Sequence, residues 1–313
     1  MRPTALYRLY GLAVASPFDL PCPPARMVRR ADVRLRPGAA DRFARLAPRG
    51  SSSHPDRDWF SCRRLQSGGT HLRWSGLFDF LVSADGHDIR YRAHRRATAE
   101  SLSAYLLGQV LSFSLLAFGV EPLHGTVVVV DGEAVGFLGD CGHGKSTLGA
   151  AFLRLGHPIL TDDLMVLART GAGYAVHPGI PRLKLFPSVA RRVLGVEPAA
   201  TRLNDGTSKR ILPLADGQAF RGPAPLRALY ALSEPGRGRA AGRIEIAPLS
   251  AGAACLELIR NTFNTIVLGR ARLARQFAFA SRVAAAVPVR RLTYPRSLPR
   301  LPEVCEAVLA DLS

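Results

Sequence analysis

Short runs of β-prone residues, separated by turns that contain glycine, are the clearest pattern in the first third of the chain. They cover residues 70–74, 78–83 and 88–92. Strands of this length joined by reverse turns are typical of small sheet-rich domains. We therefore predict a β-rich domain over residues 1–97, with a role in recognition or assembly.

A helix and then a regular alternation of strands and helices follow. Residues 99–117 place apolar side chains at helical spacing. Residues 126–130 and 134–138 are continuous apolar runs typical of buried strands, and residues 147–155 again have one apolar helical face. The fold class we predict is α/β, with this second, larger domain spanning residues 98–313.

The charge of the chain is strongly positive. Its 313 residues include 42 lysine and arginine residues against 24 acidic ones, a formal charge of +18 that would attract nucleic acid, anionic lipid or an acidic peptide. Only three of the basic residues are lysines, a bias that is typical of a GC-rich genome, so much of the charge is background. Because no helix-turn-helix, RNP or zinc-finger signature is present, no nucleic-acid partner is expected.

Zinc sites, export signals and membrane spans are not indicated. The five cysteines are scattered and form no CxxC pair. Residues 1–16 lack an uninterrupted apolar signal core. The most apolar run, residues 104–120, is shorter than the roughly 20 residues that a membrane helix needs. We expect a cytoplasmic protein that does not enter a membrane.

A phosphate-binding motif follows the second apolar run directly. Residues 139–146 fit the pattern G-x-x-x-x-G-K-S/T, between a predicted strand and a predicted helix. In such a loop the glycines let backbone N–H groups converge on a phosphate, the lysine reaches the outer phosphates and the hydroxyl binds Mg²⁺. The sequence thus predicts ATP and Mg²⁺ as cofactors. The predicted nucleotide-binding residues are Gly139, Asp140, Cys141, Gly142, His143, Gly144, Lys145, Ser146 and Thr147.

Two adjacent carboxylates, Asp162 and Asp163, follow the next predicted strand, residues 158–161. In a parallel sheet this end of the strand lies beside the phosphate-binding loop. One carboxylate could then hold Mg²⁺ while the other accepts a proton from an attacking hydroxyl. A helix or turn cap is the alternative interpretation. His124, before the first apolar run, is by itself more typical of a solvated or core histidine.

Three segments together resemble the catalytic core of the HPr kinase/phosphorylase family. They are His124-Gly125, the loop at 139–146, and residues 155–163, which read Leu-Gly-His-Pro-Ile-Leu-Thr-Asp-Asp. That family consists of bacterial P-loop serine kinases related in fold to phosphoenolpyruvate carboxykinase, so the resemblance implies this fold for the second domain. In the family the matching aspartate is the general base on the substrate serine. The residues that the resemblance places in the active site are His124, Lys145 and Asp163.

The chain departs from the family after the aspartate pair. The family has a glutamate there that helps to bind Mg²⁺, whereas residues 164–196 contain no acidic residue. The metal is therefore expected to depend on Ser146 and Asp162. The whole pattern is more similar to the HPr-kinase-like proteins of lasso-type ribosomal peptide pathways. That resemblance implies phosphorylation of a serine in a precursor peptide.

Lys184 and Lys209 are the two lysines outside the loop in a chain that otherwise uses arginine. A compact ammonium on a flexible stem suits contact with phosphate. Both lysines are therefore candidates for the nucleotide or acceptor site, and a solvated surface position is the alternative. We expect residues 182–186 to face the acceptor.

The function we predict is ATP- and Mg²⁺-dependent transfer of the γ-phosphate to a serine hydroxyl of a protein or ribosomal precursor peptide. Asp163 would take the hydroxyl proton, Lys145 and the loop N–H groups would neutralise the moving charge, and His124 would orient the phosphate or the acceptor. Two alternatives stay open: an ATP-binding regulatory protein without phosphotransfer, and a small-molecule kinase. A homo-oligomer is expected.

Overall fold

A computed structural model describes residues 4–25, 30–46, 59–171, 173–197, 202–204, 207–234 and 242–313. The chain forms two compact units, Met1–Val120 and Glu121–Ser313. The predicted boundary near residue 97 lies earlier than this division. We describe each unit by itself.

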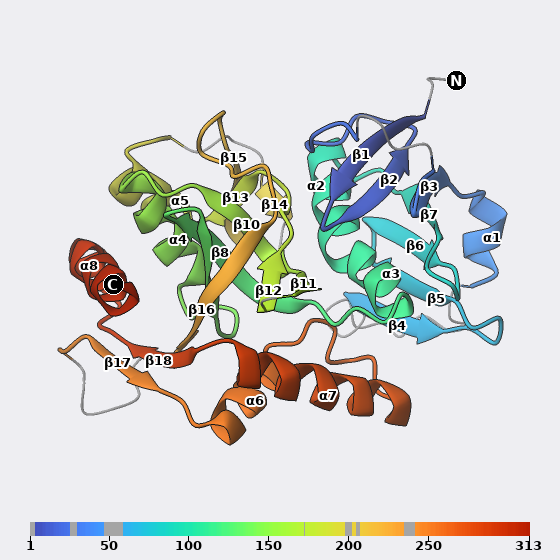
Figure 1. The fold of residues 1–313 in the computed structure, drawn as a ribbon. Coiled ribbons are helices and arrows are strands. Elements are labelled where there is room, and N and C mark those ends of the chain that lie inside the picture. Colours follow the sequence, from blue (N-terminus) through green and yellow to red (C-terminus); the bar gives the residue numbers. More distant parts are fainter. Residues whose placement is uncertain are drawn as a thin grey trace. The chain divides into compact units, whose positions relative to one another are not determined.

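The first unit is built on a seven-stranded mixed sheet with the order β1-β2-β3-β7-β6-β5-β4 (Figure 1). The predicted strands at 70–74, 78–83 and 88–92 are confirmed as β5, β6 and β7. The strands are β1 (Ala5–Leu9), β2 (Leu12–Ser16), β3 (Val33–Pro37), β4 (Phe60–Arg64), β5 (Thr70–Trp74), β6 (Phe78–Val82) and β7 (Asp88–Ala93). The helices are α1 (Ala40–Ala44), α2 (Ala99–Tyr105), the π turn η1 (Leu106–Val110) and α3 (Leu111–Ala117).

The helical segment at 99–117 belongs to this first unit because it packs on its sheet. The ring of Tyr105 lies 4.8 Å from that of Trp74 and 5.3 Å from that of Phe78, centroid to centroid. Burial of aromatic side chains of this size dominates the energy of a small core. Periodicity identified the helix correctly but carried no information about the sheet on which it packs.

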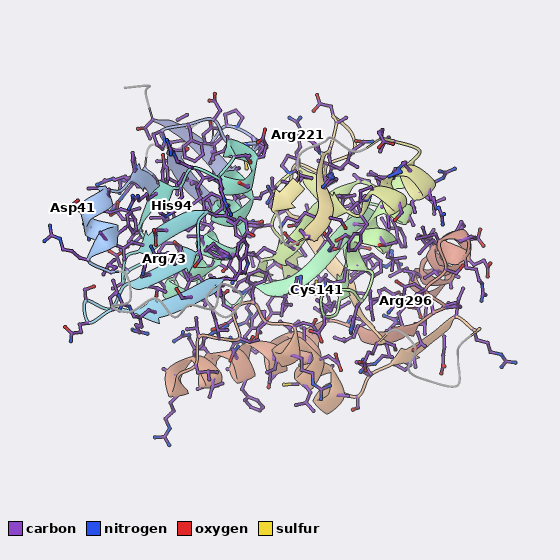
Figure 2. The ribbon with its side chains drawn as sticks, turned by 180° about the vertical axis from the view of Figure 1, so that it is seen from behind. Asp41, Arg73, His94, Cys141, Arg221 and Arg296 are labelled. Atoms are coloured by element: carbon purple, nitrogen blue, oxygen red, sulfur yellow. The ribbon has the colours of Figure 1, made fainter. Side chains whose placement is uncertain are left out.

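A buried carboxylate on β6 links three basic side chains of the first unit. Asp79 is fully buried, and its two oxygens lie 2.9 Å from His71 Nε2 and 2.8 Å from His94 Nε2. Arg73 Nε lies 3.3 Å from the same carboxylate; Figure 2 labels Arg73 and His94. Burial alone would raise the pKa of Asp79, but the two histidine bonds and the arginine charge outweigh it and lower the pKa. The carboxylate is therefore ionised and paired.

We expect Asp79→Asn to lower the free energy of unfolding by about 1.5–3 kcal/mol at pH 7, because an amide N–H₂ would face donors that now bond to a carboxylate. Since the folded-state pKa of Asp79 is lowered, the stabilisation is present above the unfolded value and is lost as the pH falls through the folded one. Denaturation at pH 7 and in acid, with exposed Asp41→Asn as the control, measures this. An equal loss at both pH values would contradict the ionised assignment.

The second unit has an eight-stranded mixed sheet with the path β10-β8-β9-β16-β12-β11, and β18 joins it between β16 and β17. A separate three-stranded sheet has the order β13-β15-β14. The strands are β8 (Leu123–Val130), β9 (Glu133–Leu138), β10 (Ile159–Met165), β11 (Leu167–Thr170), β12 (Gly173–Val176), β13 (Arg182–Leu185), β14 (Arg202–Asn204), β15 (Thr207–Pro213), β16 (Ala224–Leu232), β17 (Glu245–Pro248) and β18 (Val289–Thr293). The helices are α4 (Lys145–Arg154), α5 (Pro187–Val189), η2 (Ala190–Leu194), α6 (Ala251–Arg260), α7 (Arg270–Ala286), η3 (Leu298–Arg300) and α8 (Leu301–Leu312).

Both faces of the large sheet are buried, which explains the continuous apolar runs in its strands. Val128 and Val130 of β8 pack in a core with α4 and α8. The alternate residues Val127 and Val129 pack in a second core with α6 and α7 (Figure 1). Since side chains on a strand alternate between faces, every position of such a strand must be apolar. The predicted α/β class holds for this unit.

The path of β10 differs from the prediction. The strand runs through the aspartate pair to Met165 instead of ending at it, and it pairs antiparallel with β8. The parallel neighbour of β9 is β16. The β8–β9 hairpin therefore inserts an antiparallel strand between the pair and the strand that leads into the loop. Because β10 and β9 are both antiparallel to β8, they run in the same direction, and the aspartate pair still lies beside the loop as expected, one strand away from β9.

Candidate active site

The loop between β9 and α4 has the backbone that its glycines allow. Gly142 and Gly144 have φ angles of +88° and +89°, in the left-handed region that favours glycine. Gly144 is the N-cap of α4, and no side chain caps this end of the helix. The first N–H groups of a helix have no partner within it and carry partial positive charge. This end of α4 is thus suited to bind an anion, as the sequence predicts.

Lys145 begins α4 and is buried, with 7% of its surface exposed. Its ammonium donates hydrogen bonds to the carbonyl oxygens of Gly139 at 2.6 Å and Asp140 at 3.0 Å. Burial lowers the pKa of Lys145, and the charges of the nearby Asp162 and Asp163 oppose this. The lysine therefore bridges both ends of the loop and lies in the field of the aspartate pair.

Strand register aligns the aspartate pair with the start of the loop. Across the sheet, Gly125 of β8 pairs with Asp163 on one side and with Leu138 on the other. Leu138 is the last residue before the loop. Helix α4 also lies close to β8, since a Cβ on Gly149 would come 2.7 Å from Thr126 Cγ2. In the first turn of α4, Ser146 contacts Asp162 in the middle of β10.

Asp162 is buried, and its carboxylate is fully engaged in hydrogen bonds. Oδ1 accepts from Thr126 Oγ1 at 2.6 Å and from Ser146 Oγ at 2.9 Å. Oδ2 accepts from the backbone N–H of Lys184 at 3.0 Å. Burial raises the pKa of Asp162, and the neighbouring charge of Asp163 raises it further. The structure thus brings together Ser146 and Asp162, the two residues predicted to hold Mg²⁺.

Asp163 points to a different partner. Its Oδ2 forms an ion pair with Lys184 Nζ, at the edge of the three-stranded sheet. Burial would raise the pKa of Asp163, but the Lys184 charge and hydrogen bond outweigh it and lower the pKa. The residue has a φ of +90°, a value that few residues other than glycine adopt and that is commonest for asparagine and aspartate among them. This backbone directs adjacent carboxylates to different neighbours.

His124 lies at the start of β8, paired with Leu164 next to the aspartates. Its ring meets the ring of Phe263 edge-on, with the centroids 5.7 Å apart. Burial lowers the pKa of His124 to about 4, and the positive charge of Lys145 contributes. The imidazole is therefore neutral at neutral pH. It can orient a ligand by hydrogen bonding but adds no charge.

The charges of all three lysines of the chain, Lys145, Lys184 and Lys209, act on His124. Lys209 Nζ lies 5.4 Å from the centre of the Phe186 ring, which is exposed. The sequence predicted Lys184 at the nucleotide or acceptor site. In the structure its ammonium forms an ion pair with Asp163, one of the predicted site residues. Within 182–186, Arg182 is buried and only 5% exposed, so this part of the segment is not an open surface.

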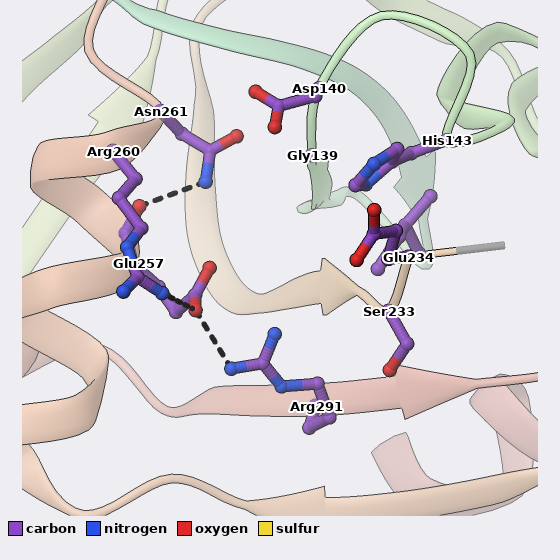
Figure 3. Close-up of a pocket in the computed structure, with 10 residues that line it drawn as sticks. Gly139, Asp140, His143, Ser233, Glu234, Glu257, Arg260, Asn261 and Arg291 are labelled. Carbon is purple, nitrogen blue, oxygen red and sulfur yellow. Dashed lines mark hydrogen bonds and ion pairs between the residues drawn. The ribbon is translucent and has the colours of Figure 1, made fainter. Parts of the chain in front are cut away.

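A cavity of about 540 Å³ lies beside the first half of the loop (Figure 3). It opens where the parallel strands β9, β16 and β18 end, the position at which α/β sheets bind ligands. Glu257 of α6 pairs in its wall with Arg260 at 3.2 Å and Arg291 at 2.8 Å. The other lining residues are Gly139, Asp140, His143, Leu232, Ser233, Glu234 and Asn261. Apart from the loop residues, none of them belongs to a sequence motif, so sequence analysis missed them.

The residues of this site can bind Mg²⁺ only together with ligands from outside the chain. Among the residues that the structure describes, no group of three or more histidine, cysteine, aspartate or glutamate side chains could hold a metal ion. A hydroxyl and a carboxylate, such as Ser146 and Asp162, are hard oxygen ligands of the kind that Mg²⁺ uses together with substrate phosphates and water. The site therefore suits a metal that arrives with a nucleotide.

Comparisons with known proteins give a likeness to solved structures but none to a family model or a curated protein. The solved structure of the Hpr(Ser) kinase/phosphatase from Coxiella burnetii is similar to it, with 13% sequence identity and a TM-score of 0.35. The match covers 61% of this chain and 94% of that chain. At this level it identifies neither a fold nor an activity here. Separately, no helix of the described part is long and apolar enough to cross a membrane.

Proposed function

We propose that the protein is an ATP- and Mg²⁺-dependent kinase that phosphorylates a serine hydroxyl. One observation carries the proposal: Ser146 of the phosphate-binding loop donates a hydrogen bond to Asp162, next to Asp163 and Lys184. A phosphate-binding loop, a carboxylate and hydroxyl pair for a metal, and a second carboxylate for a proton are the parts that phosphoryl transfer requires. They come from elements far apart in the sequence.

In the proposed reaction, the loop N–H groups and Lys145 bind the outer phosphates. Lys145 exchanges its bonds to the Gly139 and Asp140 carbonyls for phosphate oxygens. Ser146 and Asp162 would hold Mg²⁺, which supplies charge neutralisation on the phosphates when bound. Asp163 accepts the proton of the serine hydroxyl as its oxygen bonds to the γ-phosphorus. The bond from phosphorus to the bridging oxygen breaks, and ADP leaves.

Lys184 and His124 position these groups. The Lys184 ammonium fixes Asp163, and its backbone N–H fixes Asp162, so one residue sets the geometry of both carboxylates. Neutral His124 lies in the same field and would orient the phosphate or the acceptor. Acceptors of the class implied by the sequence, a protein or a ribosomal precursor peptide, are part of this proposal. A homo-oligomer working in the cytoplasm is proposed with it.

A transfer assay with γ-labelled ATP tests the proposal. The full chain is incubated with MgATP and, in separate reactions, with serine peptides, with small-molecule alcohols and without acceptor. We expect acid-stable label on peptide serine. Label on the small alcohols alone would favour a small-molecule kinase. Tight MgATP binding with no transfer to any acceptor would favour the regulatory alternative.

Cys141 offers a chemical probe of the loop. It is exposed, whereas Cys22 and Cys62 are half-buried and Cys255 and Cys305 are buried. We expect a maleimide to label Cys141 first and to block nucleotide binding, because the adduct would fill the phosphate-binding turn. MgATP should slow this labelling at least tenfold.

Peptide mass spectrometry of labelled protein measures the protection. A Cys141→Ser variant, which keeps the small polar side chain, is the control and should bind MgATP after maleimide treatment. Equal labelling of Cys141 with and without MgATP would show that the nucleotide does not bind at the loop.

A further inference from the structure

Arg296 follows β18 and carries a guanidinium that the fold only partly satisfies. Nη2 donates a hydrogen bond to the carbonyl oxygen of Ser233 at the end of β16. Nε and Nη1 are buried and have no hydrogen-bond partner among the described residues. No carboxylate in the described part forms an ion pair with Arg296 either. Figure 2 labels Arg296 in the second unit.

The guanidinium is held next to the phosphate-binding loop. Its central carbon lies 4.0 Å from the centre of the Tyr294 ring, over the face of that ring. A Cβ built on Gly144 would lie 2.9 Å from the Tyr294 hydroxyl and 3.6 Å from Arg296 Nη1. Both side chains therefore adjoin the residue that caps α4. The stacking and the Ser233 bond fix the plane of the guanidinium, and its Nε and Nη1 edge stays unpaired.

A second arginine of the same unit, Arg272, shows the contacts of a structural role. Arg272 is 5% exposed and uses all three of its nitrogen atoms. Nε pairs with Glu121 at 3.2 Å, Nη2 donates to the carbonyl oxygen of Phe263 at 2.6 Å, and Nη1 donates to that of Val267 at 2.8 Å. A buried charge is costly unless it is paired in this way. Among the described residues Arg296 has no carboxylate partner of this kind, so its Nε and Nη1 edge is open to an anionic ligand.

We propose that Arg296 contacts the phosphates of the bound nucleotide through Nε and Nη1. This inference rests on the proposed function, because it takes the loop at 139–146 as the phosphate site. The planar guanidinium edge matches two phosphate oxygens, which a lysine ammonium does not. Arg296 would thus act on the phosphates together with Lys145, from an element about 150 residues later in the chain.

Titration calorimetry on the full chain tests the proposal with two ligands, MgATP and tripolyphosphate, which has the phosphates without the nucleoside. We expect Arg296→Met to bind both ligands about 10- to 100-fold more weakly, since a charge-assisted contact is lost. Arg296→Lys should fall between this variant and the wild type, because it keeps the charge but not the planar edge. Arg300→Met, four residues on, removes a guanidinium that pairs with Glu303 and should not change either affinity.

Thermal unfolding without ligand separates binding from a structural role. If Arg296 serves the ligand, Arg296→Met should melt at the wild-type temperature or above it, because a half-buried guanidinium with two unpartnered nitrogen atoms is removed. An Arg296→Met protein that binds MgATP and tripolyphosphate with wild-type affinity would overturn the proposal, whatever its melting temperature. A wild-type protein that binds neither ligand would instead overturn the proposed function itself.

Discussion

Lys145→Met should lower the rate of phosphoryl transfer by more than about 100-fold and weaken MgATP binding about 10- to 100-fold. The physical reason is the loss of a buried ammonium that lies in the loop, within reach of the outer phosphates. Methionine keeps most of the apolar stem, so the packing under the loop is preserved. A transfer assay and titration calorimetry on the same protein measure the two effects.

Two controls accompany the Lys145 variant. Arg154→Met removes a cation from the last turn of the same helix, where the guanidinium donates to the Val193 carbonyl at 2.7 Å. It should leave both transfer and MgATP binding unchanged. Thermal unfolding shows whether loss of the two loop hydrogen bonds unfolds the protein. A folded Lys145→Met protein that binds and transfers normally would end the assignment of the loop.

Asp163→Asn is expected to reduce the rate of transfer by about 10² to 10⁴ while MgATP binds within about threefold of the wild type. Asparagine keeps the shape of the side chain but cannot take a proton. It also tolerates the φ of +90° at this position, since asparagine and aspartate are the side chains most often found there. An Asp163→Ala variant would strain the backbone and remove the base at the same time, so a lower rate would not distinguish the two effects.

Asp162→Asn is the matched comparison, one residue away on the same strand. Its carboxylate oxygens accept hydrogen bonds from two hydroxyls and one N–H. In asparagine one of these two oxygens is replaced by an N–H₂ group, which donates. We expect weaker Mg²⁺ dependence and weaker nucleotide binding together. Calorimetry with MgATP and a transfer assay on both variants separate the roles. Near wild-type transfer by Asp163→Asn would reject the proposed base.

Local patterns predicted the parts of this molecule that depend on neighbouring residues. The glycine spacing at 139–144, the strand before it and the helical face after it are all encoded within about 20 residues. The paired strands β5 to β7 were predicted for the same reason, because short turns join them. Periods of 2 and 3.6 residues are enough to identify such elements.

Features that depend on distant residues were not predictable in this way. The antiparallel place of β10 beside β8 follows from strand pairing, which periodicity does not encode. The Lys184 bond to Asp163 joins positions 21 residues apart on two sheets. Glu257 of α6 and Arg296, in the segment after β18, lie near the loop from positions more than 100 residues later and belong to no motif. For Lys184 and Lys209 the one available signal was the rarity of lysine in a chain that otherwise uses arginine.

Hydrogen–deuterium exchange of the full chain with and without MgATP tests the central claim, that nucleotide phosphates bind in the loop beside the aspartate pair. The readout is the exchange of the backbone amides at 139–147, which would donate to phosphate oxygens. We predict that saturating MgATP slows their exchange markedly, and that it does so far less in Lys145→Met at the same nucleotide concentration. If MgATP at saturating concentration slows exchange elsewhere on the wild-type chain but leaves these amides unchanged, the account is contradicted.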